Sequence, residues 1–572
     1  MTTRWDIFRC PPELRDKLSK QLDIPPIIAQ LLIKRGITDV QEGERFLSPL
    51  LQHLYDPFLM KDMEKGVARI IQALQHKEKI TIYGDYDVDG ITACALLVDF
   101  LGSLESHTSY YIPHRLDEGY GLNANAVRNI AANGTNLLIC VDCGISDREE
   151  ILLAQQLGVD TIVVDHHEPP LLPSPAYAVL DPLQPDCPFP FKGLAGVGVA
   201  FYLVIALRSR LRDAGFWQDK IEPNLHRYLD LVSLGTIADI VPLIDVNRVL
   251  VKHGLKELGN SIRTGIVALK EVSGIGKEAI STGHVGFRMA PRLNAGGRIA
   301  SAHMGVELLL TQDRARADSI AAELDQVNRE RQGIEEKIYQ EAKGMIERDG
   351  LLARRSIILS SDEWHPGVIG IVASRIAEAF CRPTILIALG GDEGKGSARS
   401  IAGFHIYEGL QACEKHLMGF GGHKYAAGLT INRKKLSVFE DSFEETVKIK
   451  LGDEDFKPTI HLDAEIGLEE ITPDLLNCLS RFSPFGPANP KPIFTTKKRL
   501  PINDIQILKK DTLKFTIQES QRAYEVIGFG KGHLANHLTS KLRIAFYPQM
   551  HEWQGVQRLQ LELKAVETDI EG

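Results

Sequence analysis

At 572 residues the chain is too long for one hydrophobic core, so its length predicts about three or four domains. The hydrophobic fraction of 44% and the charged fraction of 25% are those of an ordinary globular protein. The 66 basic and 75 acidic residues give a formal charge of −9, which excludes a uniformly basic nucleic-acid coat but allows a local basic groove.

The sequence carries no pattern typical of secretion or membrane insertion. Its first residues lack the apolar core of a signal peptide, and no run of about 18 apolar residues suggests a membrane span. The eight cysteines are scattered, as in proteins of the reducing cytoplasm. We therefore expect a cytoplasmic protein. Cys140 and Cys143 form a CxxC without a second cysteine pair, which favours strand-end packing over zinc or redox chemistry.

After a predicted helical lead-in, three aspartates follow an apolar run that predicts a β-strand. Asp85, Asp87 and Asp89 occupy alternate positions, and in extended chain such residues point the same way. Carboxylates placed like this repel one another unless protons or a cation neutralise them, and their oxygens suit Mg²⁺ or Mn²⁺. An acidic surface turn is the alternative, and this segment alone does not decide between the two.

Two later strands also end in acidic residues. The strand at 136–141 precedes Asp142, and the strand at 161–164 precedes Asp165, His166 and His167. Strands and helices alternate between about 80 and 180, which predicts a largely parallel sheet whose strand ends meet at one edge. One strand-end aspartate is often only a helix cap, but three of them, one with tandem histidines, favour a metal centre.

Two further segments bear on this site. Asp239 lies deep in apolar sequence before Pro242, and a buried carboxylate needs a partner that a metal would supply. An aspartate cap before a proline-terminated turn is the alternative. Residues 193–200 are rich in glycine but fit no phosphate-binding spacing, so we interpret them as the start of a closely packed helix.

Cationic segments follow in the second half of the chain. Residues 284–303 carry Arg288, Arg292 and Arg298 among small residues, which suits an anion pocket, with solvated arginines as the alternative. A long polar helix is predicted at 311–348. The glycine-rich segments at 394–400 and 419–428 belong to a second α/β block and predict binding of a polyanion.

The tail, from about 454, consists of short alternating runs that predict a small β-barrel. Cations and aromatic rings lie side by side in it, a combination typical of single-strand binding, although some rings would belong to the barrel core. The cations are Lys497, Lys498, Arg499, Lys509, Lys510, Lys514 and Arg543, and the rings are those of Phe515, Phe546, Tyr547 and Trp553.

The ordered set of motifs resembles the DHH phosphoesterase superfamily. The motifs are YGDYDVDG at 83–90, VDCG at 141–144, DHH at 165–167 and GTIAD at 235–239. GGHKYAAG at 421–428 resembles the DHH-associated C-terminal domain. PRLNAGGR at 291–298, HPGVIGIVASR at 365–375 and PFGPANP at 484–490 narrow the resemblance to single-strand-specific 5′→3′ DNA exonucleases.

The resemblance implies an α/β protein with two α/β domains joined by a long helix around a central cleft, plus a C-terminal OB-like β-barrel. We expect a helical N-terminal lead-in at 1–50, a DHH catalytic domain at 51–305 and a connecting helix at 306–349. The DHH-associated nucleic-acid-binding domain would span 350–452, and the OB-like single-strand-binding domain 453–572.

The resemblance also implies a centre of two divalent cations, Mn²⁺ or Mg²⁺. The ligands would be drawn from Asp85, Asp87, Asp89, Asp142, His166, His167 and Asp239. Which of the first three bind directly, and whether His167 binds or only supports, stays open. A pocket for the 5′ phosphate would contain Ser397 and Arg399, with Arg298 or its close rival Arg292, and His423 would touch the strand backbone.

The implied function is single-stranded-DNA-specific 5′→3′ exonuclease activity that releases 5′-mononucleotides in DNA repair and recombination. We expect a monomer without membrane association, with single-strand-binding protein and a helicase as candidate partners. The alternatives are a phosphodiesterase for short oligoribonucleotides or cyclic dinucleotides, a pyrophosphatase-like enzyme, and a non-catalytic single-strand-binding replication scaffold. The predicted barrel argues against the first two, and the complete acid set argues against the scaffold.

Overall fold

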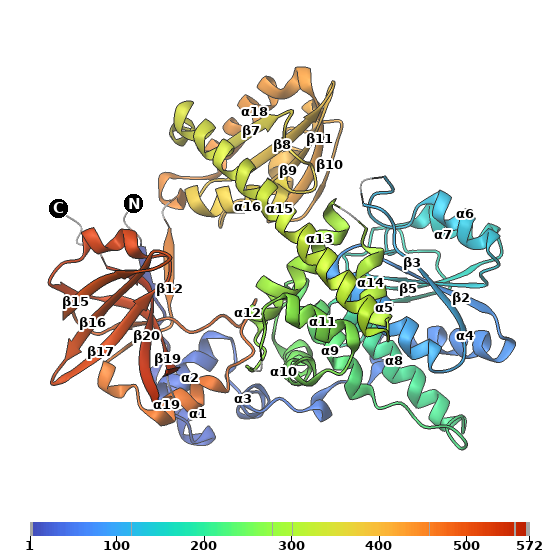
Figure 1. The fold of residues 1–572 in the computed structure, drawn as a ribbon, viewed down its shortest axis with the longest axis horizontal. Coiled ribbons are helices and arrows are strands. Elements are labelled where there is room, and N and C mark those ends of the chain that lie inside the picture. Colours follow the sequence, from blue (N-terminus) through green and yellow to red (C-terminus); the bar gives the residue numbers. More distant parts are fainter. Residues whose placement is uncertain are drawn as a thin grey trace. The chain divides into compact units, whose positions relative to one another are not determined.

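Figure 1 shows the computed structural model, which describes residues 4–115, 117–276, 278–299, 301–456, 458–553 and 556–567. The chain divides into two compact units. The larger unit comprises Trp5–Gly297, Ser301–Leu324 and His461–Gly572, and the smaller unit comprises Asp325–Ile460 with Arg298–Ala300 and Met1–Arg4. Among the described residues, no helix is long and apolar enough to cross a membrane.

A five-stranded sheet with the order β3-β2-β4-β5-β6 organises the first α/β domain, and all its neighbouring strands run parallel. Parallel sheets are covered on both faces, which explains why the sequence of these strands is almost entirely apolar. The strands are β2 (Lys79–Gly84), β3 (His107–Tyr111), β4 (Leu137–Val141), β5 (Asp160–Val164) and β6 (Ala178–Leu180).

Helices cover both faces of this sheet. Alternate residues of β4 show the two faces, because Ile139 belongs to one apolar cluster and Cys140 to the other. Helices α4 (Met63–His76), α5 (Val88–Gly102) and α8 (Gly196–Asp213) contribute to the first cluster, and α6 (Ala124–Ala132) and α7 (Arg148–Gln156) to the second. Cys140 and Cys143 are both buried in the second apolar cluster, so they pack at the strand end as predicted.

A helical layer follows the sheet in the chain. It comprises α9 (Leu229–Ala238), α10 (Asp245–Asn260), α11 (Thr264–Val272), α12 (Thr282–His284), a π-helix (Val285–Met289), α13 (Ala290–Ile299) and α14 (His303–Leu310). Helices α9 and α14 both pack against α5, so this layer extends the core of the sheet. The predicted long helix is confirmed as α15 (Arg314–Arg348), whereas residues 311–313 form a short connection from α14.

The smaller unit contains the second α/β domain, whose mixed sheet has the order β10-β11-β9-β8-β7. Only β7 and β8 run parallel. The strands are β7 (Ile357–Ser361), β8 (Thr384–Gly390), β9 (Glu393–Arg399), β10 (Gly419–Gly422) and β11 (Ala426–Asn432). The helices are α16 (Ile369–Phe380), α17 (Ile406–Gln411) and α18 (Leu436–Lys450).

The C-terminal domain is a curled eight-stranded sheet with the order β13-β14-β19-β20-β17-β16-β15-β18. Its strands are β13 (Ala464–Ile466), β14 (Phe494–Thr496), β15 (Leu500–Leu508), β16 (Thr512–Glu519), β17 (Arg522–Gly528), β18 (Lys541–Leu542), β19 (Ile544–Trp553) and β20 (Val556–Val566), with α19 (Pro473–Ser480) beside them. The small OB-like β-barrel that the alternating runs predicted is thus confirmed as a curled half-barrel sheet.

The N-terminal helices share the core of this C-terminal domain. They are α1 (Pro12–Leu22), α2 (Pro26–Lys34) and α3 (Val40–Leu47), and strand β1 (Arg4–Ile7) pairs with β12 (Thr459–Leu462). Leu31 and Leu32 of α2 are fully buried in one apolar cluster with Phe494 and Leu563. The lead-in is therefore part of the C-terminal domain's packing and not a separate body.

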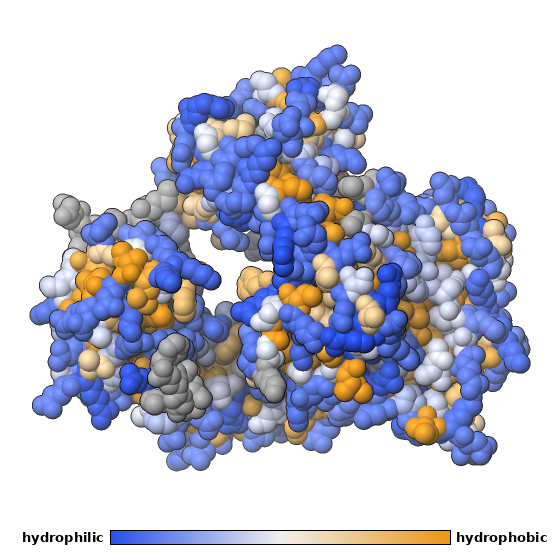
Figure 2. Space-filling view, viewed as in Figure 1, coloured by the Kyte–Doolittle hydropathy of each residue, from blue (hydrophilic) through white to orange (hydrophobic). Residues whose placement is uncertain are grey.

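The aromatic rings proposed as base-stacking groups are mostly core residues. Phe515 and Phe546 are fully buried and Tyr547 is nearly so, while the Trp553 side chain lies outside the described residues. The stacking prediction is therefore wrong for the first three rings. Figure 2 shows apolar surface over this domain, and its exposed apolar side chains include Ile505, Ile507 and Leu508 of β15.

Candidate metal centre and anion-binding segment

The predicted acidic strand ends meet at one edge of the first sheet. Asp85 directly follows β2, Asp142 follows β4 and Asp165 follows β5. Because β4 lies between β2 and β5 in the parallel sheet, the three ends adjoin. Asp239 reaches the same place from the C-terminus of α9, where it is the capping residue.

Three overlapping groups of side chains have ligand atoms within 4.8 Å of one another. The groups are Asp142 with His166 and His167, Asp89 with His166 and Asp239, and Asp85 with Asp87 and Asp142. His166 and Asp142 each belong to two of them. The structure thus brings together all the ligand candidates from the sequence.

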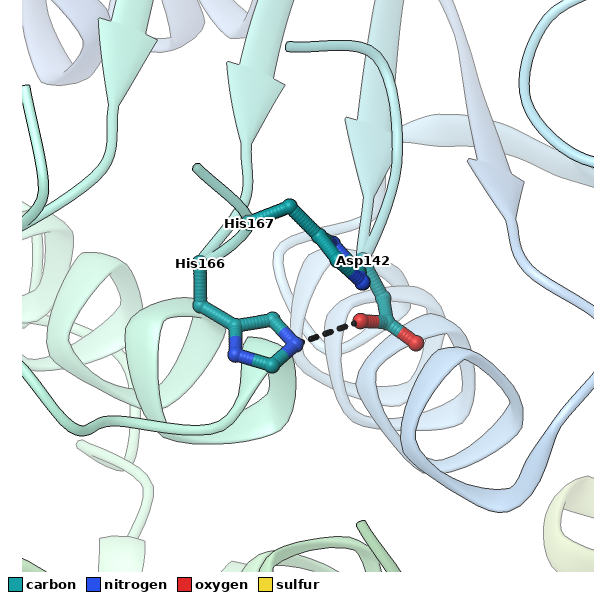
Figure 3. Close-up of side chains that lie close together, drawn as sticks. All are labelled: Asp142, His166 and His167. Carbon is teal, nitrogen blue, oxygen red and sulfur yellow. Dashed lines mark hydrogen bonds and ion pairs between the residues drawn. The ribbon is translucent and has the colours of Figure 1, made fainter. Parts of the chain in front are cut away.

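His166 lies at the centre of this constellation. Its Nε2 is 3.1 Å from Asp142 Oδ1, the contact that Figure 3 shows. The same atom is 3.6 Å from Asp239 Oδ2 and 3.8 Å from Asp89 Oδ2. One imidazole nitrogen therefore faces three carboxylates, an arrangement that a shared cation would hold together.

The three aspartates of the first motif have different surroundings. Asp87 caps α5, since its Oδ1 accepts the backbone N–H groups of Asp89 and Gly90. Asp89 is buried, and both its oxygens accept backbone hydrogen bonds from the start of α8. Asp85 is also buried, and its Oδ1 accepts no hydrogen bond from the described residues. Asp85 therefore holds an unused acceptor that a cation would satisfy.

The N-terminus of α8 supports Asp89 in a way that the sequence did not indicate. The N–H groups of Gly196 and Val197 donate to the two oxygens of Asp89 at 2.6 and 2.8 Å. A helix N-terminus attracts negative charge through its free N–H groups and its dipole. The predicted close packing is confirmed as well, because a Cβ on Gly196 would lie 2.9 Å from the Cβ of Asp142.

Asp165 serves the site as a support for His167. It is fully buried, and its Oδ1 lies 2.7 Å from Nδ1 of His167. It also accepts the backbone N–H groups of Ile145 and His166. Burial would raise the pKa of this carboxyl, but the hydrogen bond and the charge of His167 hold it below its ordinary value. Asp165 is thus an ionised orienting group.

The two adjacent histidines, His166 and His167, differ in their protonation state. Burial opposes the charged form of His167, but the bond to Asp165 and the nearby carboxylates outweigh it and raise its pKa to about 9. Burial, and next the charge of His167, lower the pKa of His166 to about 4. A neutral imidazole offers a lone pair for a metal, so His166 is the better ligand of the two.

The buried carboxyls of the site hold protons in the absence of a cation. Burial and the charge of Asp87 raise the pKa of Asp89 to about 7, and burial with Asp89 raises that of Asp239 to about 9. Burial also raises the pKa values of Asp85 and Asp142 well above their ordinary range. Oxygen-rich sites of this kind suit hard divalent cations such as Mg²⁺ and Mn²⁺, so the donor set fits the implied metals.

Helix α13 supports the first motif from the other side, which the sequence analysis missed. The side-chain oxygen of Asn294 accepts the backbone N–H of Val88 at 3.2 Å. A Cβ on Gly297 would lie 2.5 Å from the carbonyl oxygen of Tyr86, so only glycine allows this approach. The sequence analysis interprets residues 284–303 from their arginines, whereas in the structure Asn294 and Gly297 of this segment contact the motif at 83–90.

In the smaller unit, three predicted phosphate ligands gather around the start of α16. Nη1 of Arg399 donates to Ser397 Oγ at 3.0 Å, and its Nε donates to Ser374 Oγ. A Cβ on Gly370 would lie 2.9 Å from Ser397 Oγ and 3.0 Å from Arg399 Nη2. Arg298 donates from Nη1 to the carbonyl of Gly367, two residues before α16.

The remaining two candidates lie apart from these contacts. His423 follows β10 and donates its backbone N–H to the carbonyl of Ala426, the residue that pairs with Arg399 in the sheet. Its place on the neighbouring hairpin agrees with a backbone contact. Arg292 belongs to the larger unit, where its Nη1 donates to the carbonyl of Arg288 on the preceding turn. The contacts in the smaller unit thus include Arg298.

Three protein-family models match the chain. The model of the DHH family N-terminal domain matches residues 79–236, that of the DHHA1 domain residues 354–449, and that of the RecJ OB domain residues 462–565. The matched ranges correspond to the parallel sheet with its helices, the mixed sheet and the curled C-terminal sheet.

Individual relatives extend over nearly the whole chain. It is 40% identical over 570 residues to the single-stranded-DNA-specific exonuclease RecJ of Bacillus subtilis, and the match covers 98% of this chain and 70% of that relative. It is 35% identical over 574 residues to the same exonuclease of Haemophilus influenzae, and the match covers 96% of this chain and 99% of that relative.

Solved structures show the same architecture. RecJ of Thermus thermophilus in complex with Mn²⁺ matches with a TM-score of 0.84 and 30% identity over 99% of this chain and 80% of that one. Its complex with Mg²⁺ matches with a TM-score of 0.78 and 29% identity over 100% of this chain and 79% of that one.

Proposed function

The chain belongs to the RecJ family of single-stranded-DNA-specific exonucleases and is a metal-dependent enzyme, and we propose that it degrades single strands from the 5′ end with two divalent cations. The observation that carries the two-cation proposal is the overlap of three ligand groups through His166 and Asp142. A single cation needs fewer donors than these seven side chains supply, so they divide between two ions or between ligation and support.

The surroundings of each side chain suggest how the donors divide. Asp85 has a buried oxygen that accepts no hydrogen bond from the described residues, and Asp142 belongs to two groups, so both fit as ligands. His166 is neutral at physiological pH and adds a nitrogen donor, while Asp89 and Asp239 face its Nε2. The proposed ligands are Asp85, Asp87, Asp89, Asp142, His166 and Asp239. We propose that His167 supports the reaction instead, as a group fixed by Asp165.

The chemistry of the site follows from these roles. Bound divalent cations would lower the pKa of a water and offset charge on the phosphodiester oxygens. His167, held at Nδ1 by Asp165, would position the reacting oxygen with its other ring nitrogen. The hydroxyl of Tyr120 lies 3.2 Å from Nδ1 and 3.4 Å from Nε2 of His167, so it restricts the movement of the ring.

The polarity of cleavage would come from the smaller unit. We propose that Arg298, Ser397 and Arg399 bind the terminal 5′ phosphate, because guanidinium and hydroxyl donors meet there at the start of a helix. Cleavage that releases a 5′-mononucleotide leaves a new 5′ phosphate on the shortened strand. Each product end would then present the group that these residues recognise, which permits repeated cleavage.

The C-terminal domain would hold the incoming strand. Most of its predicted cations are engaged in ion pairs, such as Lys498 with Glu519 and Lys514 with Glu525. Lys509 and Lys510 lie in the turn after β15, which carries the exposed side chains of Ile505 and Ile507. We propose that bases contact this apolar strand while the two lysines face phosphates. A domain of this size has no evident use for a dinucleotide substrate.

Several finer expectations remain predictions. They are action in DNA repair and recombination, partnership with single-strand-binding protein and a helicase, a monomeric state, and a cytoplasmic location. The structure contains one chain, and the comparisons name exonucleases without naming partners.

An end-label assay tests the proposed polarity. Single strands labelled at the 5′ or the 3′ terminus are incubated with Mn²⁺, Mg²⁺ or EDTA, with duplex DNA as a control. We expect labelled mononucleotide at once from 5′-labelled strands only, and no product with EDTA. Early release of mononucleotide from the 3′ label would contradict the polarity.

Two variants sharpen this assay. Asp142→Asn should reduce cleavage by more than the roughly 10- to 100-fold typical of an outer-sphere residue, with an unchanged circular dichroism spectrum.

Arg399→Ala should reduce the preference for 5′-phosphorylated over 5′-hydroxyl strands more than it reduces binding of DNA. Equal losses on both kinds of end would remove Arg399 from the phosphate site.

A further inference from the structure

The loop at Arg481–Pro490, here called the linker loop, joins α19 to the rest of the C-terminal sheet and is fastened to helix α10 by one arginine. Arg248 is 1% exposed, and its Nη1 and Nη2 donate to the carbonyls of Phe482 and Arg481 at 2.8 and 2.6 Å. Its Nε donates to the carbonyl of Phe46 at 2.9 Å, and the Phe46 ring lies 4.0 Å from the guanidinium. Among the described residues no carboxylate pairs with it.

The residue before it on α10 contacts two other loop segments. Asn247 is fully buried, and its Nδ2 donates to the carbonyls of Gly193 and Pro242 at 2.6 and 3.0 Å. Its Oδ1 accepts no hydrogen bond from the described residues, so the side chain is used for its two donors. Asn247 therefore ties together two segments that are distant in the sequence.

Both of these segments lead directly to proposed metal ligands. Gly193 comes three residues before Gly196, whose N–H donates to Asp89. Pro242 comes three residues after Asp239. Between them, Ile240 has a φ of 62°, a left-handed conformation that is strained for a β-branched residue. Such a backbone persists only where surrounding contacts hold it.

The linker loop contacts the Asp239 segment directly as well. The N–H of Leu243 donates to the carbonyl of Pro487 at 2.9 Å. A Cβ on Gly486 would lie 2.6 Å from Cδ1 of Leu243, so the loop approaches as closely as glycine allows. Thr282 Oγ1 donates to the carbonyl of Phe485, which adds a third attachment.

We propose that Asn247 and Arg248 are positioning residues for the exonuclease reaction. Asn247 holds the segment that hydrogen-bonds Asp89 in register with the segment that carries Asp239, and Arg248 fastens the linker loop of the strand-holding domain to the same helix turn. An amide can serve two carbonyls, and only a guanidinium offers a fork of donors wide enough for the loop. This inference rests on the proposed function, because it takes Asp89 and Asp239 to be metal ligands.

The two residues should give different signatures when they are replaced. Asn247→Leu keeps the volume but removes both donors, so the affinity for Mn²⁺ should fall by about 10- to 100-fold, the range for outer-sphere partners. Arg248→Met leaves the loop unfastened, so KM should rise more for a long strand than for a tetranucleotide. Arg248→Lys keeps the charge but not the fork, and it should resemble the methionine variant.

The test uses the full chain and a matched control. Mn²⁺ binding is measured by calorimetry without DNA, single-strand binding by fluorescence anisotropy in EDTA, and KM with long strands and tetranucleotides. Arg69→Met is the control, because Arg69 is also buried but pairs with Glu78 and with Asp160 at the opposite end of β5. It should lower the melting temperature while leaving the Mn²⁺ affinity and both KM values unchanged.

Several results would overturn the inference. It fails if Asn247→Leu binds Mn²⁺ as the control does, or if Arg248→Met raises both KM values equally. It also fails if Arg248→Lys behaves as the wild type. Should Asn247→Leu not fold, Asn247→Ser, which is too short to reach both carbonyls, must show the same loss of Mn²⁺ affinity. A wild type that released no mononucleotide would refute the proposed function instead, because the calorimetric comparison does not depend on cleavage.

Discussion

His166 and His167 illustrate how one backbone turn gives two neighbouring rings opposite states. Asp165 accepts a hydrogen bond from the second ring, and its charge stabilises the imidazolium there. That imidazolium in turn lowers the pKa of the first ring, which burial has already lowered. His166 is thereby kept neutral, and its Nε2 lies beside Asp142 and Asp239. We therefore propose that His166 is a ligand and His167 a proton-bearing support.

The raised pKa values of the carboxyls predict that the metal-free protein loses stability as the pH rises. Asp89 and Asp239 have folded-state pKa values of about 7 and about 9, above the ordinary value of 3.8. The folded state then binds more protons than the unfolded state, so the free energy of unfolding falls with increasing pH. His167, raised to about 9, acts in the same direction above its ordinary value of 6.5. The loss should be clearest between pH 7 and 9.

Thermal unfolding in EDTA and in saturating Mn²⁺ checks this expectation. Without metal the melting temperature should fall across that interval, and with Mn²⁺ the fall should be smaller, because the cation replaces the protons. Calorimetry in buffers of different ionisation enthalpy should show protons released on Mn²⁺ binding at pH 7. A metal-free melting temperature that rises from pH 7 to 9 would contradict the proposed protonation.

At the scale of elements, the start of α8 connects packing to metal binding. Its free N–H groups bind Asp89, and Gly196 lies against the strand end that carries Asp142. Glycine is needed there for contact distance and not for an unusual backbone angle. One helix terminus thus positions two proposed ligands from different strands.

The variant Gly196→Ala should weaken Mn²⁺ binding. Its new Cβ would lie 3.0 Å from Asp142 Oδ1 and 3.1 Å from the Asp142 Cα, so the helix start or the strand end must shift. Overpacking of this kind costs about 1–3 kcal/mol. Calorimetric titration with Mn²⁺ should therefore show an affinity lower by about tenfold or more.

Gly198→Ala is the matched control two residues further along α8. The nearest atom to its Cβ would be Cδ2 of Leu194 at 3.1 Å, the end of a side chain that can rotate. Metal affinity in this variant should stay close to that of the wild type. If both variants lost affinity equally, a general effect on helix α8 would explain the result better than displacement of Asp142.

Across the whole molecule, local patterns predicted the architecture well and distant contacts poorly. The strand-end acids could be predicted because apolar strands and the residues that follow them are adjacent in the sequence. The support of Asp89 by Gly196 could not, since the two residues are 107 positions apart and glycine has no side chain to signal the contact. The alternation of β16 marked two faces but not which one was buried, so Phe515 was misassigned.

The shared core of the N-terminal helices and the C-terminal domain predicts how truncation should act. Removal of His461–Gly572 alone would expose the faces of α2 that Leu31 and Leu32 now bury against that domain. Removal of residues 1–48 together with it takes away both sides of the cluster. We therefore expect the single deletion to bind a hydrophobic dye strongly and to aggregate, and the double deletion to do so much less.

Both truncated proteins also lose the carbonyl of Pro487 that Leu243 contacts, so both should bind Mn²⁺ more weakly than the full chain. Slow cleavage of a tetranucleotide should remain in the double deletion, because its proposed ligands lie outside the deleted segments. Cleavage of long strands should suffer more, through a raised KM. Dye fluorescence and KM for the two substrates measure these effects. Equal dye binding by the two truncations would show that the N-terminal helices do not depend on the C-terminal sheet.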